Sequence, residues 1–174
     1  QNGISDSSID KSFETMKAVE LLLVYQDPTW TEDHFFKRTL VSFAMRWENK
    51  GLKKSGPTDQ FVTCLIKIFR AVIAVQPLSS SAVLTVLGTV FPRFIKEDAG
   101  DTSLELACID AILELTPLNP EKCLDLLKKW QTNKKGNIPP EIFSKLQQAQ
   151  SFVSQKCQLG KRQNKKRKFV KSLK

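Results

Sequence analysis

The stretch TDQFVTCLIKIFRAVIAVQP, residues 58–77, decides the fold of this chain. One of its faces repeats apolar side chains at helical spacing, at Val62, Leu65, Ile66, Phe69, Val72 and Ile73. Much of the other face is also apolar, with Phe61, Cys64, Ile68 and Val75. A helix that is apolar nearly all round is buried on two sides. We therefore expect this helix to be central.

Start and stop signals on both sides of this stretch predict six further helices. Asp27-Pro28 ends the first, because the residue before a proline disfavours helical backbone. Asn119-Pro120-Glu121 begins the sixth with a cap, a first-turn proline and an acid. The seven predicted helices start near residues 12, 32, 58, 80, 102, 120 and 140. The expected fold class is all-α, either a stacked array of antiparallel helices or a compact bundle.

Apolar periodicity also assigns core faces to the flanking helices. The first helix carries Met16, Val19, Leu22, Leu23 and Val24, and the second carries Phe36, Leu40, Phe43, Ala44 and Trp47. Pro92 should kink or shorten the helix over residues 80–96, whose β-branched side chains leave a strand as the minority alternative. Thr102 and Glu105 have the spacing of a capping box.

The net charge of +9 is concentrated at one end of the chain. Nine of the 27 Lys and Arg residues lie between residues 156 and 174, where there is no Asp or Glu, so the other 18 equal the 18 acidic residues. We therefore expect three parts: a flexible segment 1–11, an all-helical interaction domain 12–156 and a basic tail 157–174. A neutral body has no field of its own to attract nucleic acid, whereas the tail has one.

The segment 104–130 resembles a HEAT-type repeat. Ala107 and Ala111 lie inside its leucine-rich helix, which is followed by a Pro/Asn turn and a second helix. The preceding pair, 58–96, is similar in length, and pairs recur about every 40–47 residues over 12–156, as in HEAT or armadillo units. Membership of that family would imply a scaffold that binds other proteins through its concave surface or edges.

Catalytic and metal-binding patterns are not found in the sequence. Cys64, Cys108, Cys123 and Cys157 form no C-x-x-C pair, and we interpret them as reduced residues of an intracellular protein. His34 is the only histidine, in the first turn of a helix. Asp110 and Glu114 could mimic a metal pair, but a solvated face is favoured. Glycine-rich phosphate loops are absent too. We predict no enzyme activity, no cofactor, no metal and no small-molecule substrate.

The basic tail carries the clearest functional signal. Its cationic residues are Lys161, Arg162, Lys165, Lys166, Arg167, Lys168, Lys171 and Lys174. The cluster 165–168 matches a short nuclear-import pattern, in which clustered cations fit acidic grooves on an import receptor. Cations also neutralise phosphates, so non-specific contact with RNA or DNA is a second expectation. Attraction to a membrane surface is disfavoured, and the uncharged run 71–92 is interpreted as a turn between buried helices and not as a span.

The leading hypothesis is a helical scaffold domain of a nuclear multiprotein complex, with the nucleolus as a narrower location and ribosome assembly or DNA repair as contexts. Its protein partner would meet a surface that includes Trp30, Lys53, Lys54, Lys134 and Lys135. The alternative is a direct RNA- or DNA-binding protein that combines the tail with the basic loops at 50–54 and 134–135. The polar residues 1–12 contain no secretory signal, and the first residue is Gln, so we expect a piece of a longer chain.

Overall fold

The computed structural model describes residues 6–49, 57–95, 103–133 and 138–155. All regular elements in these ranges are helical, in seven continuous helices. The all-α prediction is therefore confirmed, and the strand alternative for residues 80–96 is wrong. No helix within these ranges combines the length and apolar character needed to cross a membrane.

The helices lie close to the predicted positions. The first is α1 (Asp6–Val24), which begins six residues earlier than predicted. Helix 28–49 consists of α2 (Pro28–Trp30), the π-helical η1 (Thr31–Val41) and α3 (Ser42–Asn49). After α4 (Pro57–Ile73), helix 80–94 consists of α5 (Ser80–Thr85), the π-helical η2 (Val86–Val90) and α6 (Phe91–Phe94). The last named elements are α7 (Ser103–Leu115) and α8 (Pro120–Asn133), and a final helix covers 140–155.

The chain divides into two compact units. The first ends at Gly136 and contains every element from α1 to α8. The second begins at Asn137 and contains helix 140–155, which starts at the predicted Pro139-Pro140 signal.

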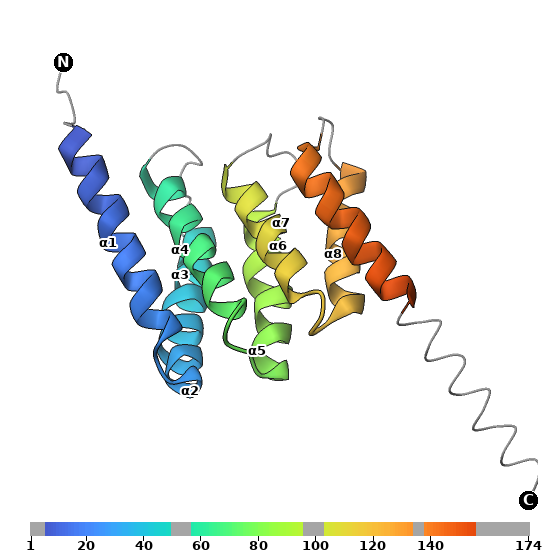
Figure 1. Ribbon diagram of the computed structural model, residues 1–174, viewed down its shortest axis with the longest axis horizontal. Coiled ribbons are helices and arrows are strands. Elements are labelled where there is room, and N and C mark those ends of the chain that lie inside the picture. The colour runs from blue at the N-terminus through green and yellow to red at the C-terminus, as the bar shows by residue number, and fades with distance from the viewer. Residues whose placement is uncertain (1–5, 50–56, 96–102, 134–137, 156–174) are drawn as a thin grey trace, which may run out of the picture. The chain divides into compact units, whose positions relative to one another are not determined.

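Within the first unit the helices form two layers. In one layer α4 packs between α1 and α7, and its contact with α7 is the most extensive of the unit. Figure 1 shows the order α1, α4, α7 from left to right. In the other layer helix 28–49 packs against helix 80–94, which also contacts α8. The central position predicted for residues 58–77 is therefore confirmed.

The two layers meet at a cluster of aromatic rings. Phe69 of α4 lies edge-on to Phe36 of helix 28–49, with ring centroids 4.9 Å apart. It also lies edge-on to Phe91 of helix 80–94, at 6.0 Å. All three side chains are fully buried. Edge-to-face contacts add to the free energy that burial already contributes, so Phe69 joins three helices that are distant in sequence.

Helix 80–94 accommodates Pro92 without breaking there. The Phe91 N–H bonds to the Val86 carbonyl five residues back, which is the π-helical pattern. A proline cannot donate to the preceding turn, and the wider π turn directly before it changes the register of the hydrogen bonds at that point. The helix ends at Phe94, two residues before the predicted end.

The predicted core faces are confirmed for α4 but not for α1. All six residues predicted on the main face of α4 are buried. On the predicted second face Ile68 is buried, whereas Phe61 is 48% exposed and Val75, which follows the end of α4, is 60% exposed. On α1 the prediction is largely wrong, because Leu23 is buried while Leu22 is 64% exposed. In the described part of the chain α1 packs mainly on α4, so only one of its faces is covered.

Glu105 has a role that the capping-box pattern did not predict. Its carboxylate is buried on α7 and accepts a hydrogen bond from the indole Nε1–H of Trp130 on α8. A buried polar pair of this kind fixes the register of two packed helices, because losing either partner leaves the other unsatisfied. Thr102, the other half of the predicted box, lies outside the described residues.

Replacing Phe69 with alanine should lower the free energy of unfolding by about 3–5 kcal/mol, because the change removes a fully buried ring and leaves a cavity between the layers. Denaturant titration followed by circular dichroism measures this loss. Phe61→Ala on the same helix is the matched control, since that ring is half-exposed, and it should cost about 1 kcal/mol or less. Equal losses for the two variants would contradict the two-layer core.

Candidate interaction surface

Most of the residues predicted for function lie outside the described part of the chain. This holds for the tail residues Lys161, Arg162, Lys165, Lys166, Arg167, Lys168, Lys171 and Lys174, and for Lys53, Lys54, Lys134 and Lys135. Cys157 lies outside it as well. Trp30 is the one predicted partner residue that the structure describes, and its role stays a prediction.

Trp30 lies at the start of helix 28–49 on a well-formed cap. Its backbone N–H donates to Oδ1 of Asp27 at 3.0 Å, and Pro28 takes the first helical position. The indole stacks on the His34 ring one turn later, with centroids 4.7 Å apart and planes 25° apart. The Trp30 side chain is 45% exposed. The stacking holds one face of the indole in place, and the rest remains available to solvent or a partner.

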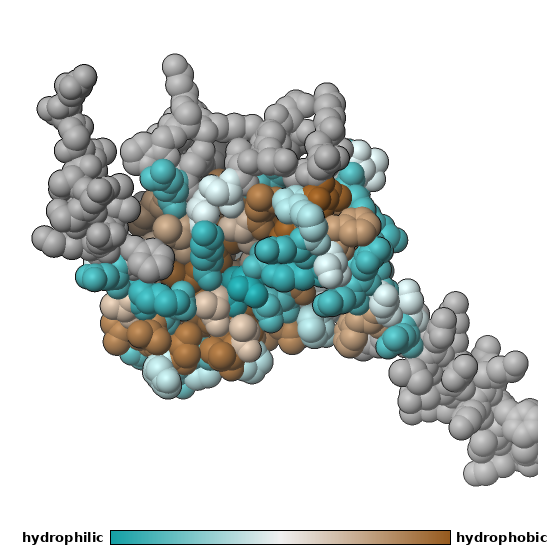
Figure 2. Space-filling view, turned by 45° about the horizontal axis from the view of Figure 1, so that its top comes forward, coloured by the Kyte–Doolittle hydropathy of each residue, from teal (hydrophilic) through white to brown (hydrophobic). Residues whose placement is uncertain are grey.

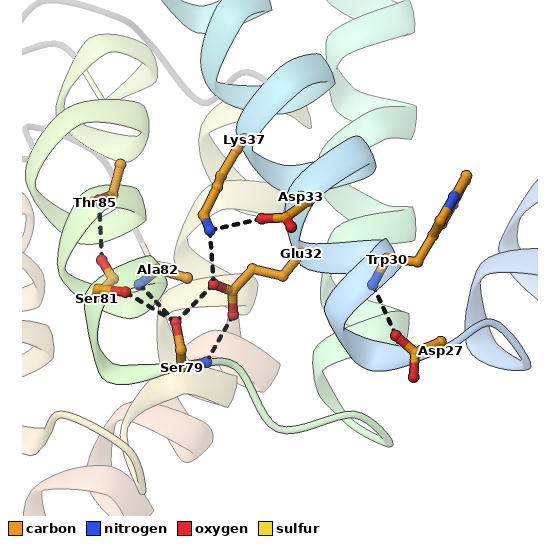
Figure 3. A network of polar contacts seen from close by, with 9 residues as sticks. All are labelled: Asp27, Trp30, Glu32, Asp33, Lys37, Ser79, Ser81, Ala82 and Thr85. Atoms are coloured by element: carbon orange, nitrogen blue, oxygen red, sulfur yellow. Dashed lines mark hydrogen bonds and ion pairs between the residues drawn. The ribbon is translucent and has the colours of Figure 1, made fainter.

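Glu32 ties the start of helix 28–49 to the start of helix 80–94. Figure 3 shows its two carboxylate oxygens reaching Ser79, whose Oγ–H donates at 2.8 Å and whose backbone N–H donates at 3.0 Å. Lys37 adds an ion pair with Glu32 at 3.2 Å and a second with Asp33 at 2.8 Å. Ser79 also caps α5 by accepting from the Ala82 N–H. One carboxylate therefore organises two helix starts.

These contacts lower the pKa of Glu32 below its ordinary value of 4.5. Partial burial by itself raises the pKa, because it disfavours the charged form. The hydrogen bonds from the Ser79 backbone and side chain, together with Lys37, outweigh that effect. The charged carboxylate is thus the form that the fold stabilises.

Gln76 fixes the end of α1 to the end of α4. Its buried side-chain amide nitrogen lies within hydrogen-bonding distance of three carbonyl oxygens, which share its two N–H donors: those of Leu23 at 3.1 Å, Val24 at 2.7 Å and Gln26 at 2.9 Å. The last carbonyls of a helix have no partner within the helix, so Gln76 serves as a cap supplied by the turn that follows α4. No residue pattern within α1 predicts this cap.

The outward face of α1 is the surface that the sequence analysis missed. It consists of Leu21, Leu22 and Tyr25, which are 54%, 64% and 86% exposed. Leu21, and Tyr25 directly after the end of α1, lie opposite Leu23, the residue that packs inward, while Leu22 lies on the flank about 100° from it. In Figure 2 apolar side chains gather at the lower left, where Figure 1 places the ends of α1 and α4. The sequence does contain a signal for this exposed surface. Leu21, Leu22 and Leu23 are consecutive, so they cannot all be buried on a helix that packs on one side only.

Asp110 and Glu114 lie on a partly exposed face of α7, with side chains 21% and 35% exposed. Both carboxylates of α7 hold the guanidinium of Arg70 on α4, at 2.8 Å and 3.5 Å. They strengthen the most extensive helix contact of the unit. Among the residues that the structure describes, no group of three or more His, Cys, Asp or Glu could hold a metal ion.

Two of the cysteines are core residues, as predicted. Cys108 and Cys123 are fully buried, and Cys64 is partly buried. Burial raises the pKa of the Cys123 thiol to about 12, against a smaller lowering effect from its hydrogen bond with Thr116. Burial also raises the pKa of Cys108, and the nearby Glu105 charge adds to the rise. Neither thiol is suited to nucleophilic chemistry near neutral pH, because the thiolate is the reactive form.

Comparison with known proteins places the helical body in a family. Residues 3–149 match the family described as "Little elongation complex subunit 1, C-terminal domain". The protein named little elongation complex subunit 1 from Homo sapiens is 21% identical over 154 residues, which cover 84% of this chain and 7% of that protein. The Mus musculus protein of the same name is 23% identical over 148 residues, 80% of this chain and 7% of its own length. No solved structure matches.

This match corrects the resemblance to HEAT and armadillo repeats. The family matched over residues 3–149 is a different one. The earlier resemblance rested on helix pairs of similar length, and any stack of antiparallel helices produces such a period. The match also gives no support to ribosome assembly. This chain spans only about 7% of the length of the two curated relatives.

Replacing Glu32 with glutamine should lower the free energy of unfolding at neutral pH by about 1–2 kcal/mol, because it removes charge-assisted hydrogen bonds at a partly exposed site. Since the fold lowers this pKa, the stabilisation is present above about pH 4.5 and is lost as the pH falls through the lowered value. The difference between wild type and variant should therefore shrink in acid. Denaturant titrations at several pH values measure it.

Glu14→Gln is the control for that series, because Glu14 is exposed on α1 and its charge should contribute less than about 0.5 kcal/mol. A Glu32→Gln effect that stays constant down to about pH 3 would contradict the role assigned to its carboxylate.

Iodoacetamide should alkylate the folded protein at Cys64 well before Cys108 and Cys123, because the two buried thiols are neither ionised nor accessible. Mass spectrometry of tryptic peptides after timed alkylation at about pH 8 measures the order. In denaturant the three sites should react at similar rates. Early modification of Cys123 in the folded protein would contradict its assignment to the core.

Proposed function

Since the chain belongs to the family of the C-terminal domain of little elongation complex subunit 1, we propose that its helical body is a non-enzymatic docking domain of a nuclear multiprotein complex of that kind. The match over residues 3–149 carries the proposal. The partners would be other protein subunits of the complex.

The arrangement of polar side chains supports a scaffold role. Glu32 joins helix 28–49 to the start of helix 80–94 by accepting hydrogen bonds from Ser79. The ion pair of Arg70 with Asp110 joins α4 to α7, and Glu105 accepts from Trp130 between α7 and α8. These charged groups hold helices to one another. Large apolar side chains such as Leu22 and Tyr25 remain on the surface instead, and exposed apolar groups gathered in one place are typical of protein-binding surfaces.

The basic tail would direct the domain to the nucleus. Lys165, Lys166, Arg167 and Lys168 form an uninterrupted cationic run of the type that import receptors bind. The same run would make weak, salt-sensitive contact with RNA or DNA, because neutralised phosphates release counterions. The folded body would then select protein partners while the tail determines location.

Neutralising the tail separates these two roles. In the full chain, replacing Lys165, Lys166, Arg167 and Lys168 with glutamine should shift the protein from the nucleus to the cytoplasm in fluorescence microscopy. Co-purification of little elongation complex subunits from whole-cell extract should persist, because the docking surface is untouched. Immunoprecipitation with quantitative mass spectrometry measures this binding.

The opposite pattern would contradict the proposal. If the wild-type chain brings down no such subunit, the docking function is wrong. If the neutralised variant loses every partner and also loses binding to RNA or DNA with a steep salt dependence, the tail alone is the binding element. The protein would then be the nucleic-acid binder of the alternative hypothesis.

A further inference from the structure

The outward face of α1 combines large exposure with apolar character. Leu21, Leu22 and Tyr25 lie within two helical turns and are each more than half exposed. Trp30, 45% exposed, follows five residues after Tyr25 at the start of the next helix. These four residues, which we call the α1 corner, form one stretch of chain around the turn between two helices.

The α1 corner is held in place. Gln76 binds the carbonyl oxygens of Leu23, Val24 and Gln26, so the last turn of α1 is fixed to the end of α4. Asp27 caps the following helix through the Trp30 N–H, and the Trp30 ring is stacked on His34. Preorganised side chains lose little conformational entropy on binding. The corner therefore presents its apolar groups at low entropic cost.

The surroundings of the α1 corner are acidic. Residues 14–30 contain three acidic side chains, Glu14, Glu20 and Asp27, against one basic residue, Lys17. Lys17 is paired with Glu20 at 3.0 Å, while Glu14 and Asp27 are exposed. The last turn of α1 contains no basic residue, and a helix C-terminus carries a partial negative charge. In the described part of the chain its cap is the neutral amide of Gln76 and not a cation.

We propose that the α1 corner docks an amphipathic helical segment of a protein partner, whose apolar face is flanked by Lys or Arg. The apolar side chains of that segment would cover Leu22, Tyr25 and Trp30, and its cations would meet Glu14, Asp27 and the end of α1. A helix laid along an exposed apolar strip is a common mode of peptide recognition, and complementary charge fixes its orientation and speeds association. This inference rests on the proposed docking function and names one surface for it.

Charge also argues against two other occupants. A second copy of the chain related by two-fold symmetry would bring the same acidic side chains and the same helix end to the interface, and like charges in an interface oppose association. An anionic membrane surface would repel the exposed carboxylates of Glu14 and Asp27. A cationic partner segment satisfies both the apolar and the acidic features.

A pair of synthetic peptides tests the proposal on the full chain. Both would be helical, with the same Leu and Phe face, one flanked by Lys and the other by Glu at the same positions. Fluorescence anisotropy should show that the Lys peptide binds the wild-type chain and that added salt weakens its binding. The double variant Leu22→Ser/Tyr25→Ser should bind the Lys peptide about tenfold more weakly.

Leu84→Ser is the matched control, since Leu84 is 51% exposed and belongs to α5, which contributes no residue to the corner. It should bind the Lys peptide as the wild type does. Circular dichroism should show equal helix content in all variants, because the replaced side chains are exposed. Binding of the Glu peptide would report on the basic tail, and the corner variant should leave it unchanged.

Equal affinity of the wild type and the double variant for the Lys peptide would overturn the proposal. A concentration-dependent dimer that the double variant abolishes would also overturn it, because a second copy of the chain would then be the occupant. Stronger binding of the wild-type chain to vesicles of anionic lipid than to the Lys peptide would overturn it as well. Co-purification of complex subunits with the wild type, without any loss in the double variant, would reject this surface while leaving the docking function standing. Failure of the wild type to bring them down would reject the docking function itself.

Discussion

The burial of α4 on two sides is the constraint on which the rest of the first unit depends. Phe69 lies against Phe36 and Phe91, which belong to the other layer, while α1 and α7 flank the helix within its own layer. A fully buried ring with partners on two helices cannot shift without opening a cavity. The positions of helix 28–49 and helix 80–94 follow from this arrangement.

Helix α1, at the edge of its layer, is packed differently from α4. In the described part of the chain α1 packs mainly on α4, so its opposite side is not covered by another described helix. The side-chain amide of Gln76 completes its attachment by donating a hydrogen bond to a carbonyl oxygen at the end of α1. The uncovered side of α1 carries Leu21, Leu22 and Tyr25. An edge helix that keeps such side chains outside has apolar surface to offer a partner, which connects the packing of the fold to the proposed docking function.

The sequence predicted those features of the fold that depend on residues close together in the chain. Helix ends follow from residues such as Pro28 and Pro120, and the inward face of α4 follows from its periodicity. It could not determine which face of α1 is covered, because three consecutive leucines give no preferred side and the answer depends on the neighbouring helix. Glu105 and Gln76 were missed for a related reason. Their partners lie 25 and about 50 residues away, and no local spacing reveals them. The family, too, was misjudged from helix pairing, which many all-α proteins share.

Amide hydrogen–deuterium exchange of the full chain, followed by mass spectrometry, tests the central claim that a doubly buried α4 organises the unit while α1 is its one-sided edge. We expect the slowest exchange in α4 and α7, and faster exchange along α1 from Glu14 to Val24, because a helix packed on one side opens locally at lower free energy. Protection of α1 equal to that of α4 would contradict it, since α1 would then have to be covered on its outward face as well.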